Sequence, residues 1–147
     1  TTFGNGTWSQ SSDERLKENI ADSTAGLSFI NDLRPRTFKW RKAKNVGDTY
    51  LREYEEGSDR YVKGDIDNDG THKTWHGFIA QEVQTTINAH SEVKDGNNII
   101  SELDGAEGQT GTLGMAEAAL IPILTKAIQE LSEKNDALEA RIATLEG

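Results

Sequence analysis

The C-terminal end of the chain carries a strict heptad pattern, which constrains the fold more than any other feature of the sequence. Apolar residues recur there at alternating steps of four and three. Isoleucine or asparagine fills the a positions and leucine fills every d position, a pattern typical of helices that pack against partner helices. We therefore predict a long helix over 116–146 that bundles with other chains. The seam residues are Leu124, Ile128, Leu131, Asn135, Leu138, Ile142 and Leu145.

The heptad pattern leaves the number of partner helices open. Isoleucine at a with leucine at d favours two strands, and Asn135 at an a position sets the register of the bundle. The alternative interpretation is a single amphipathic helix that packs on its own domain.

Composition supports burial against other chains and argues against several kinds of partner. The 147 residues suffice for one domain, but only 34% are hydrophobic and the net charge is -9. This charge disfavours nucleic acid and anionic membrane surfaces as partners. The sequence has no cysteine, no apolar run of the roughly 20 residues that a membrane span needs, and no signal-peptide pattern. We expect no nucleic-acid and no membrane partner.

Helix and strand patterns alternate through the middle of the chain, which predicts an α+β fold. Apolar residues recur at helical spacing within 22–33, and Pro35 ends that helix. The sequence RTFKW at 36–40 alternates polar and apolar residues as a strand does. The sequence GFIAQEVQTTINA at 77–89 begins as a strand and becomes helical from about residue 81.

Turn signals predict two further hairpins. The polar segment 41–76 contains EEGSD and NDGT and predicts a projecting β-hairpin arm. The sequence EVKDGNNIISEL at 92–103 predicts a second hairpin around Asp95 and Gly96, and the glycine-rich segment 104–114 predicts a loop. The expected architecture is a small β-rich body with this arm and a long C-terminal helix.

Two patterns that could indicate a metal site are incomplete. The sequence DIDNDG at 65–70 matches the first half of a calcium-binding loop, but Lys73 and His76 stand where the ninth and twelfth ligand positions fall. A polar β-turn is the simpler interpretation. His72, His76 and His90 do not form a typical zinc pattern. We expect neither a metal nor another cofactor.

The sequence SSDERLK at 11–17 places a serine ahead of a lysine in a way that could support catalysis. Ser12 precedes Lys17 by five residues. A serine hydroxyl becomes a competent nucleophile when a neutral amine accepts its proton. Lysine is neutral when burial or a nearby positive charge lowers its pKa, and Arg15 is a local cation that could act in this way. A solvated loop is the simpler interpretation of the spacing alone.

Four segments, in their order along the chain, resemble a known family. They are SSDERLKENI at 11–20, FKW at 38–40, GFIAQEV at 77–83 and LIPILTKAIQEL at 120–131. Together they resemble the C-terminal intramolecular chaperone domain of phage tail spikes and tail fibres, the endosialidase-type peptidase S74 family. The chain is similar in particular to the chaperone of an L-shaped coliphage tail fibre. The likeness covers nearly all of the chain from Ser12, and the arm segment is its least matched part.

The resemblance implies a homotrimer, held by the coiled coil, that aids folding and assembly of the upstream tail-fibre segment of the same polypeptide. The domain then releases itself by autocatalytic cleavage, as a single-turnover serine peptidase. The nucleophile corresponds to Ser12, the general base to Lys17 and the severed bond to Ser12–Asp13. Residues 1–12 correspond to the end of the fibre and 13–147 to the chaperone. The expected location is the host cytoplasm during virion assembly, with the chaperone absent from the mature virion.

Three further residues are candidates for support of the serine–lysine dyad: Arg15, Gln81 and Glu82. For Gln81 and Glu82 the simpler interpretation is the first turn of a helix, where the helix dipole favours Glu.

The sequence does not decide by which route the bond would be cut, or whether cleavage is part of the function. Attack by the Ser12 hydroxyl on its own carbonyl would form a strained four-membered ring. Attack on the carbonyl of Ser11 would form a five-membered ring but cut one bond earlier, and attack between two chains avoids the ring altogether. The alternative function is a permanent trimerisation or receptor-binding tip without protease activity.

Overall fold

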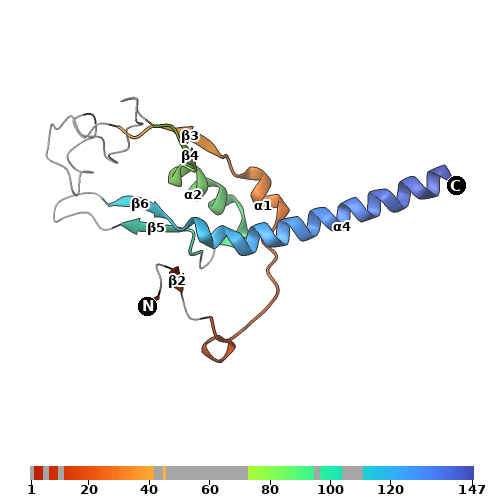
Figure 1. Cartoon of the computed structure of the whole chain (residues 1–147), viewed down its shortest axis with the longest axis horizontal. Coiled ribbons are helices and arrows are strands. Elements are labelled where there is room, and N and C mark those ends of the chain that lie inside the picture. Colours follow the sequence, from red (N-terminus) through yellow and green to blue (C-terminus); the bar gives the residue numbers. More distant parts are fainter. Residues whose placement is uncertain are drawn as a thin grey trace.

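The computed structural model describes residues 2–4, 7–9, 12–41, 45, 73–94, 97–103 and 111–147, and it confirms the α+β class (Figure 1). Six strands form three two-stranded antiparallel sheets in the described part, β1 with β2, β3 with β4 and β5 with β6. The strands are β1 (Thr2–Gly4), β2 (Thr7–Ser9), β3 (Arg36–Phe38), β4 (Trp75–Gly77), β5 (Ile100–Leu103) and β6 (Thr112–Met115). The helices are α1 (Leu27–Asp32), α2 (Ala80–Ala89), α3 (Ser91–Lys94) and α4 (Ile121–Glu146), with short 3₁₀ turns at η1 (Glu14–Leu16) and η4 (Glu117–Leu120).

Helix α1 is shorter than the predicted segment 22–33 because its N-terminal part is not helical. The Ser23 hydroxyl accepts a hydrogen bond from the backbone N–H of Ala25 at 3.3 Å. Such a local bond competes with the helical hydrogen-bond pattern, so the chain stays extended until Gly26. The predicted end is confirmed, since the helix stops at Asp32, ahead of Pro35.

The strand predicted at 36–40 is confirmed over residues 36–38, and the helical part of 77–89 is confirmed as α2. The strand before this helix lies earlier than predicted, since β4 covers 75–77 and only Gly77 falls in the predicted segment. Strand β3 pairs with β4, with Thr37 opposite His76, and α2 follows β4 after two residues. The two strands bring the ends of the predicted arm side by side (Figure 1). Most of the arm segment 41–76 lies outside the described residues, so its hairpin stays a prediction.

The predicted hairpin around Asp95 and Gly96 is wrong. Residues 92–94 of that segment belong to the short helix α3, whose Val93 is buried in the core. Strand β5 instead pairs with β6, with Ile100 opposite Met115. The predicted loop 104–114 is therefore also too long at its C-terminal end, because Thr112 onward is a strand.

The hydrophobic core lies where α1, α2 and the beginning of α4 meet (Figure 1). Phe29 from α1 and Ile87 from α2 are completely buried, and Ile123 from α4 packs into the same cluster. The ring of His90 contacts Phe29 edge to face. The remaining members of the cluster are Ala25, Leu33, Val83, Val93, Ile99 and Leu120.

The predicted long helix is confirmed as α4, which is 26 residues long and starts after the η4 turn. Pro122 lies in its first turn, where the missing N–H costs no hydrogen bond. One face of its first turns is buried through Ile123 and Ala127, and the rest of the helix projects from the body (Figure 1). Within the described ranges, no helix combines the length and apolar character that a membrane crossing requires.

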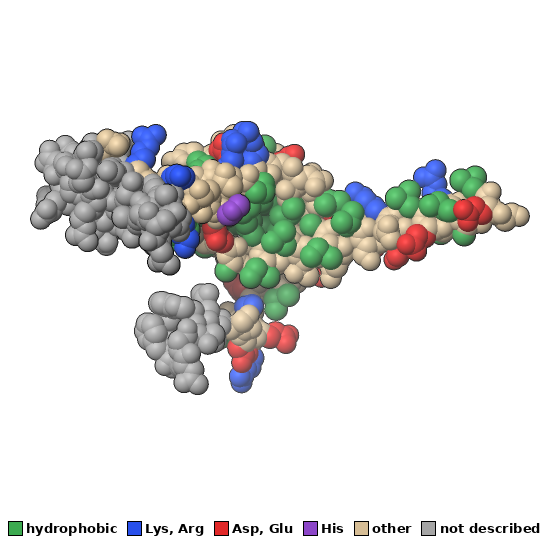
Figure 2. Space-filling model, turned by 45° about the horizontal axis from the view of Figure 1, so that its top comes forward, with side chains coloured by type: hydrophobic (Ala, Val, Ile, Leu, Met, Phe, Trp, Pro, Cys, Tyr) green, Lys and Arg blue, Asp and Glu red, His purple; other side chains and the backbone are tan. Residues whose placement is uncertain are grey.

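The predicted heptad seam is exposed along α4. Ile128 is 67% exposed, Leu131 56% and Leu145 85%, and apolar side chains line the projecting helix in Figure 2. The structure contains a single chain, so packing of this seam against other helices stays a prediction.

Candidate active site

Ser12 and Lys17 lie on either side of the η1 turn, and their side chains meet. The ammonium group of Lys17 donates a hydrogen bond from Nζ to Ser12 Oγ at 2.7 Å. A direct bond of this length is the geometry that proton transfer from a serine hydroxyl to a lysine amine needs. The five-residue spacing noted in the sequence therefore folds into a contact between the predicted nucleophile and the predicted base.

The turn that creates this contact is closed by Asp13. One oxygen of the Asp13 carboxylate accepts hydrogen bonds from the backbone N–H and from Nε of Arg15, at 2.9 and 3.0 Å. The other oxygen accepts from Nη2 of Arg15 at 2.7 Å. The side-chain bond from Arg15, followed by its backbone bond, lowers the pKa of Asp13. Asp13 thus acts as the N-cap of η1 and holds the turn that brings Lys17 back to Ser12.

Arg15 therefore contacts Asp13 rather than the dyad. Its guanidinium group is matched with a carboxylate of opposite charge, which offsets the positive charge that the sequence offered as an influence on Lys17. Arg15 therefore stabilises the turn through Asp13, the residue that follows Ser12.

Ser12 and Lys17 lie at the rim of an open groove of about 680 Å³. The floor is formed by α3, by the residues before β5, and by the start of α4. Both small and polar side chains line the groove, so an extended peptide could lie in it. Its lining includes Glu92, Val93, Asn97, Asn98, Ile99, Ala116, Ala118, Ala119, Pro122 and Ile123.

The dyad is exposed in the single chain. Ser12 and Lys17 both have exposed side chains. Lysine accepts a proton only in its neutral form, which burial favours. A peptidase role therefore requires another surface, from an upstream segment or a second chain, to cover Lys17.

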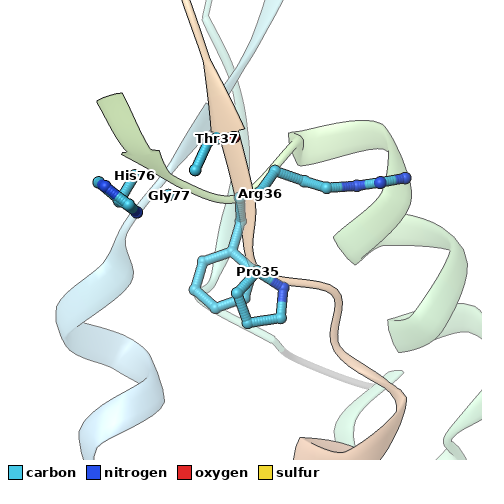
Figure 3. A pocket seen from close by; sticks show the side chains of 6 residues that line it. Pro35, Arg36, Thr37, His76 and Gly77 are labelled. Atoms are coloured by element: carbon cyan, nitrogen blue, oxygen red, sulfur yellow. The ribbon is translucent and has the colours of Figure 1, made fainter. Parts of the chain in front are cut away.

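Glu82, a predicted supporting residue, pairs with two arginines in the described structure. Its carboxylate accepts hydrogen bonds from Arg36 Nε at 2.9 Å and from Arg36 Nη2 at 2.5 Å, and Arg34 Nη1 lies 3.6 Å away. The Arg36 side chain reaches toward α2 in Figure 3. The hydrogen bonds from Arg36 lower the pKa of Glu82, against the opposing effect of burial. Glu82 therefore ties β3 to α2.

Gln81 is also placed away from the dyad. It lies exposed in the first turn of α2, and its backbone oxygen accepts a hydrogen bond from the Thr85 hydroxyl at 2.9 Å. Neither Gln81 nor Glu82 lines the groove of Ser12 and Lys17. Within one chain, the described structure does not bring these two residues to the dyad.

Of the residues considered for metal binding, His76 and His90 lie in the described part of the chain. His76 is exposed on β4, beside an open hollow whose walls include Pro35 and Thr37 (Figure 3). No group of three or more His, Asp, Glu or Cys side chains is placed to bind a metal among the residues described. His72 and the segment 65–70 lie outside them.

His90 has a role that the sequence did not reveal. Its Nδ1 lies 2.8 Å from a Glu92 oxygen and its Nε2 lies 2.8 Å from an Asp32 oxygen. These bonds, Glu92 first and Asp32 second, raise the pKa of His90, although burial opposes them. His90 is only 9% exposed and links the end of α1 to α3. His90 and Asp32 are 58 positions apart in the sequence, so no local pattern predicts their hydrogen bond.

Comparison with known proteins connects this geometry with one family. A family model described as Peptidase_S74, chaperone of endosialidase, matches residues 12–91. The match begins at Ser12, includes Lys17 and covers more than half of the 147 residues. No curated protein matches the chain. The likeness to an L-shaped coliphage tail fibre therefore stays a prediction.

Proposed function

Because the chain belongs to the Peptidase_S74 family, whose model is described as a chaperone of endosialidase, we propose that it is a self-releasing intramolecular chaperone of a phage tail fibre. The observation that carries the peptidase part is the 2.7 Å contact between Lys17 Nζ and Ser12 Oγ at the start of the family match. In this proposal the dyad cuts the Ser12–Asp13 bond once. Residues 1–12 stay with the fibre and residues 13–147 leave as the chaperone.

The cleavage divides into two steps. The Ser12 hydroxyl gives its proton to neutral Lys17, and Oγ forms a bond with the carbonyl carbon of the scissile peptide. The C–N bond then breaks, and the proton passes to the new amino group of Asp13. Water hydrolyses the resulting ester and leaves a free hydroxyl and a carboxylate. The in-chain route requires the strained ring described above, and a route between two chains avoids it.

The trimeric coiled coil belongs to the same proposal and is supported by the exposed seam of α4. Apolar side chains such as Ile128 and Leu131 are more than half exposed in one chain. Three parallel helices would bury them and hold three fibre ends at high effective concentration. A long β-rich fibre has slow, non-local folding and a register to fix, so such a clamp favours correct assembly.

Release after assembly gives the fibre kinetic stability. Once the chaperone leaves, separation of the fibre chains is governed by the rate of unfolding. The proposed setting is the host cytoplasm during virion assembly, and the proposed mature virion lacks the released domain.

A permanent trimerisation or receptor-binding tip is the second candidate function. The exposure of Lys17 in the single chain favours it, because a solvated lysine is not a general base. The two functions share the seam of α4 and differ only in whether Ser12 reacts.

The decisive experiment follows intact mass over time for a chain that includes its upstream fibre segment. The parent is compared with Ser12→Ala and Lys17→Ala, and Lys94→Ala, an exposed lysine of α3, is the matched control. The proposal expects the parent and the control to be cut and both dyad variants to stay whole. The fragment mass identifies the severed bond. A folded parent trimer that stays whole would leave the permanent tip as the function.

A further inference from the structure

The N-terminus of helix α1 is capped by a residue from the opposite end of the sequence. Gly26, the N-cap residue, has no side chain that could satisfy the first N–H groups of the helix. Instead, the backbone N–H of Leu27 donates a hydrogen bond to Glu130 Oε2 at 2.9 Å. Glu130 belongs to α4 and lies 103 positions further along the chain. The cap is therefore a tertiary contact between α1 and the predicted assembly helix.

Glycine at position 26 makes room for this contact. A Cβ atom at Gly26 would lie 2.6 Å from Glu130 Oε1 and 2.8 Å from Glu130 Cδ. Real Cβ atoms do not approach other atoms so closely, so any side chain there would displace the carboxylate. Gly26 is buried and Glu130 is half-buried. The absence of a side chain at position 26 thus leaves the space that the Glu130 carboxylate occupies.

Glu130 lies on the same face of α4 that borders the dyad groove. Ile123, Ala127 and Glu130 follow one another at the four- and three-residue spacing of one helix face. Ile123 lines the groove together with Ser12 and Lys17, and Ala127 is buried. One face of α4 therefore carries both the cap of α1 and a residue that lines the groove of the dyad.

The segment 12–26 has little else to hold it in place. Apart from the η1 turn it contains no helix or strand, and residues 12–24 are exposed. Figure 1 shows it leaving the start of α1 beside α4 and running away to η1. Its anchor is the short stretch formed by buried Ala25, by Gly26 and by the capped N–H of Leu27. Loss of the cap should loosen the segment from the helix that lies next to it.

We propose that Glu130 is a positioning residue that ties the dyad-bearing segment to α4, so that cleavage depends on the helix that assembles. This inference rests on the proposed function. The seam residues Ile128 and Leu131 flank Glu130 in the sequence. Packing of the seam against partner helices would therefore fix the position of the part of α4 that carries the cap. Glu130 does not touch the reacting atoms and acts only through the position of the segment.

The first test measures the cleavage rate of assembled trimers that carry the upstream fibre segment. Glu130→Ala and Gly26→Ala break the contact from its two sides, and Glu133→Ala removes an exposed carboxylate from the same helix as a control. We expect both contact variants to cleave about five- to tenfold more slowly at unchanged trimer fraction, which corresponds to loss of a helix cap. Glu130→Gln keeps an acceptor oxygen and should restore most of the rate. Parent rates in both contact variants would overturn the inference.

The second test measures amide hydrogen exchange in a Ser12→Ala background, where the chain stays whole. We expect faster exchange at the Leu27 amide and at the hydrogen-bonded amides of Leu16, Lys17 and Ala25 in Glu130→Ala and Gly26→Ala, and no change in Glu133→Ala. Faster exchange at Leu27 with an unchanged cleavage rate would show a cap that does not position the dyad, which contradicts the inference. If the parent itself never cleaves, the proposed function fails, and this result is distinct from a parent that cleaves as fast as its cap variants.

Discussion

The body of the molecule buries its largest apolar side chains, whereas the projecting part of α4, residues 131–146, exposes them. In the body, Phe29 and Ile87 reach zero exposure within one chain. Along the projecting helix, Leu138 and Ile142 are equally apolar and more than half exposed. The body has enough partners to complete its core, and the projecting helix has none within the described residues of the chain.

This difference teaches which part of the molecule depends on other chains. Helix propensity alone does not keep a long apolar seam in water, because exposed apolar area is unfavourable and a partner helix removes it. The dyad is exposed in the single chain, as the seam is. Ser12 and Lys17 contact each other, but no other surface in the described part of the chain covers their side chains. We therefore expect changes in the body to act on the single chain and changes in the seam to act on the assembly.

The largest expected effect separates the two regions by stability. Phe29→Ala removes a completely buried ring and should cost about 3–5 kcal/mol of unfolding free energy. Ile142→Ala should change the unfolding of the single chain by less than about 0.5 kcal/mol, because its side chain is exposed there. Urea unfolding at a protein concentration low enough to give single chains measures both. Equal losses would show that the seam already packs within one chain.

The next effect appears only in the assembly. Leu131→Asp places a charge in the centre of the predicted seam and should raise the dissociation constant of the trimer by at least about a hundredfold, since a buried unpaired charge is strongly unfavourable. Glu133→Gln, an exposed change on the other side of the same helix turn, serves as the control. Sedimentation equilibrium gives the oligomeric state of each. An unchanged association would locate the interface elsewhere.

A third effect concerns the polar position within the seam. Asn135 at an a position should set the register at a cost in stability, and its amide donates to Glu139 at 2.9 Å within one helix. Asn135→Leu should raise the melting temperature of the assembly and yield more than one oligomeric state. Light scattering after size separation distinguishes these states. A single trimer of unchanged stability would remove Asn135 from this role.

A smaller effect lies within the body and depends on pH. Carboxylates of Glu92 and Asp32 raise the pKa of His90 above its ordinary value of about 6.5. The stability that the charged ring contributes is complete below about pH 6.5 and is lost as the pH rises through the raised pKa.

The matched variant isolates this contribution. The melting temperature of the parent should exceed that of His90→Gln most clearly near pH 6, and the difference should shrink toward higher pH. Thermal unfolding at several pH values, all above the range in which Glu92 titrates, measures it. A difference that grows with pH would contradict the assignment of a charged imidazole.

The smallest effect tests the ion pair between Arg15 and Asp13, which closes the turn next to the dyad. Arg15→Gln removes the partner of Asp13 but leaves Ser12 and Lys17 in place, and exposed ion pairs contribute little. Cleavage should slow only slightly, far less than in Lys17→Ala. Intact mass over time compares the two variants. A complete loss of cleavage would show that Arg15 takes part in the reaction and does not only stabilise the turn.

Local sequence patterns predicted the elements whose partners are close in sequence. The heptad predicted the long helix α4, although it begins at Ile121 and not at residue 116, and Pro35 predicted the end of α1. The pattern at 77–89 predicted the helix α2, whose preceding strand β4 already ends at Gly77. The dyad was also local, because its two residues are separated by one turn.

Contacts between distant segments were not predictable in this way. The Asp95–Gly96 turn signal suggested a hairpin, but residues 92–94 belong to helix α3, with Val93 buried in the core, and β5 pairs with a later strand. Glu82 was a candidate for support of the dyad, and in the described structure it pairs with Arg36. The cap of Glu130 on Leu27 joins segments that no periodic pattern relates. In each case tertiary packing decides between options that local chemistry leaves equal.

The most direct test of the account is native mass spectrometry of the chain with its upstream fibre segment, in which oligomeric state and cleavage are observed together. The account predicts that cut chains occur in trimers, that single chains stay whole, and that Leu131→Asp abolishes both assembly and cleavage. Single chains cut at Ser12–Asp13 at the same rate as trimers would contradict the claim that assembly completes the site.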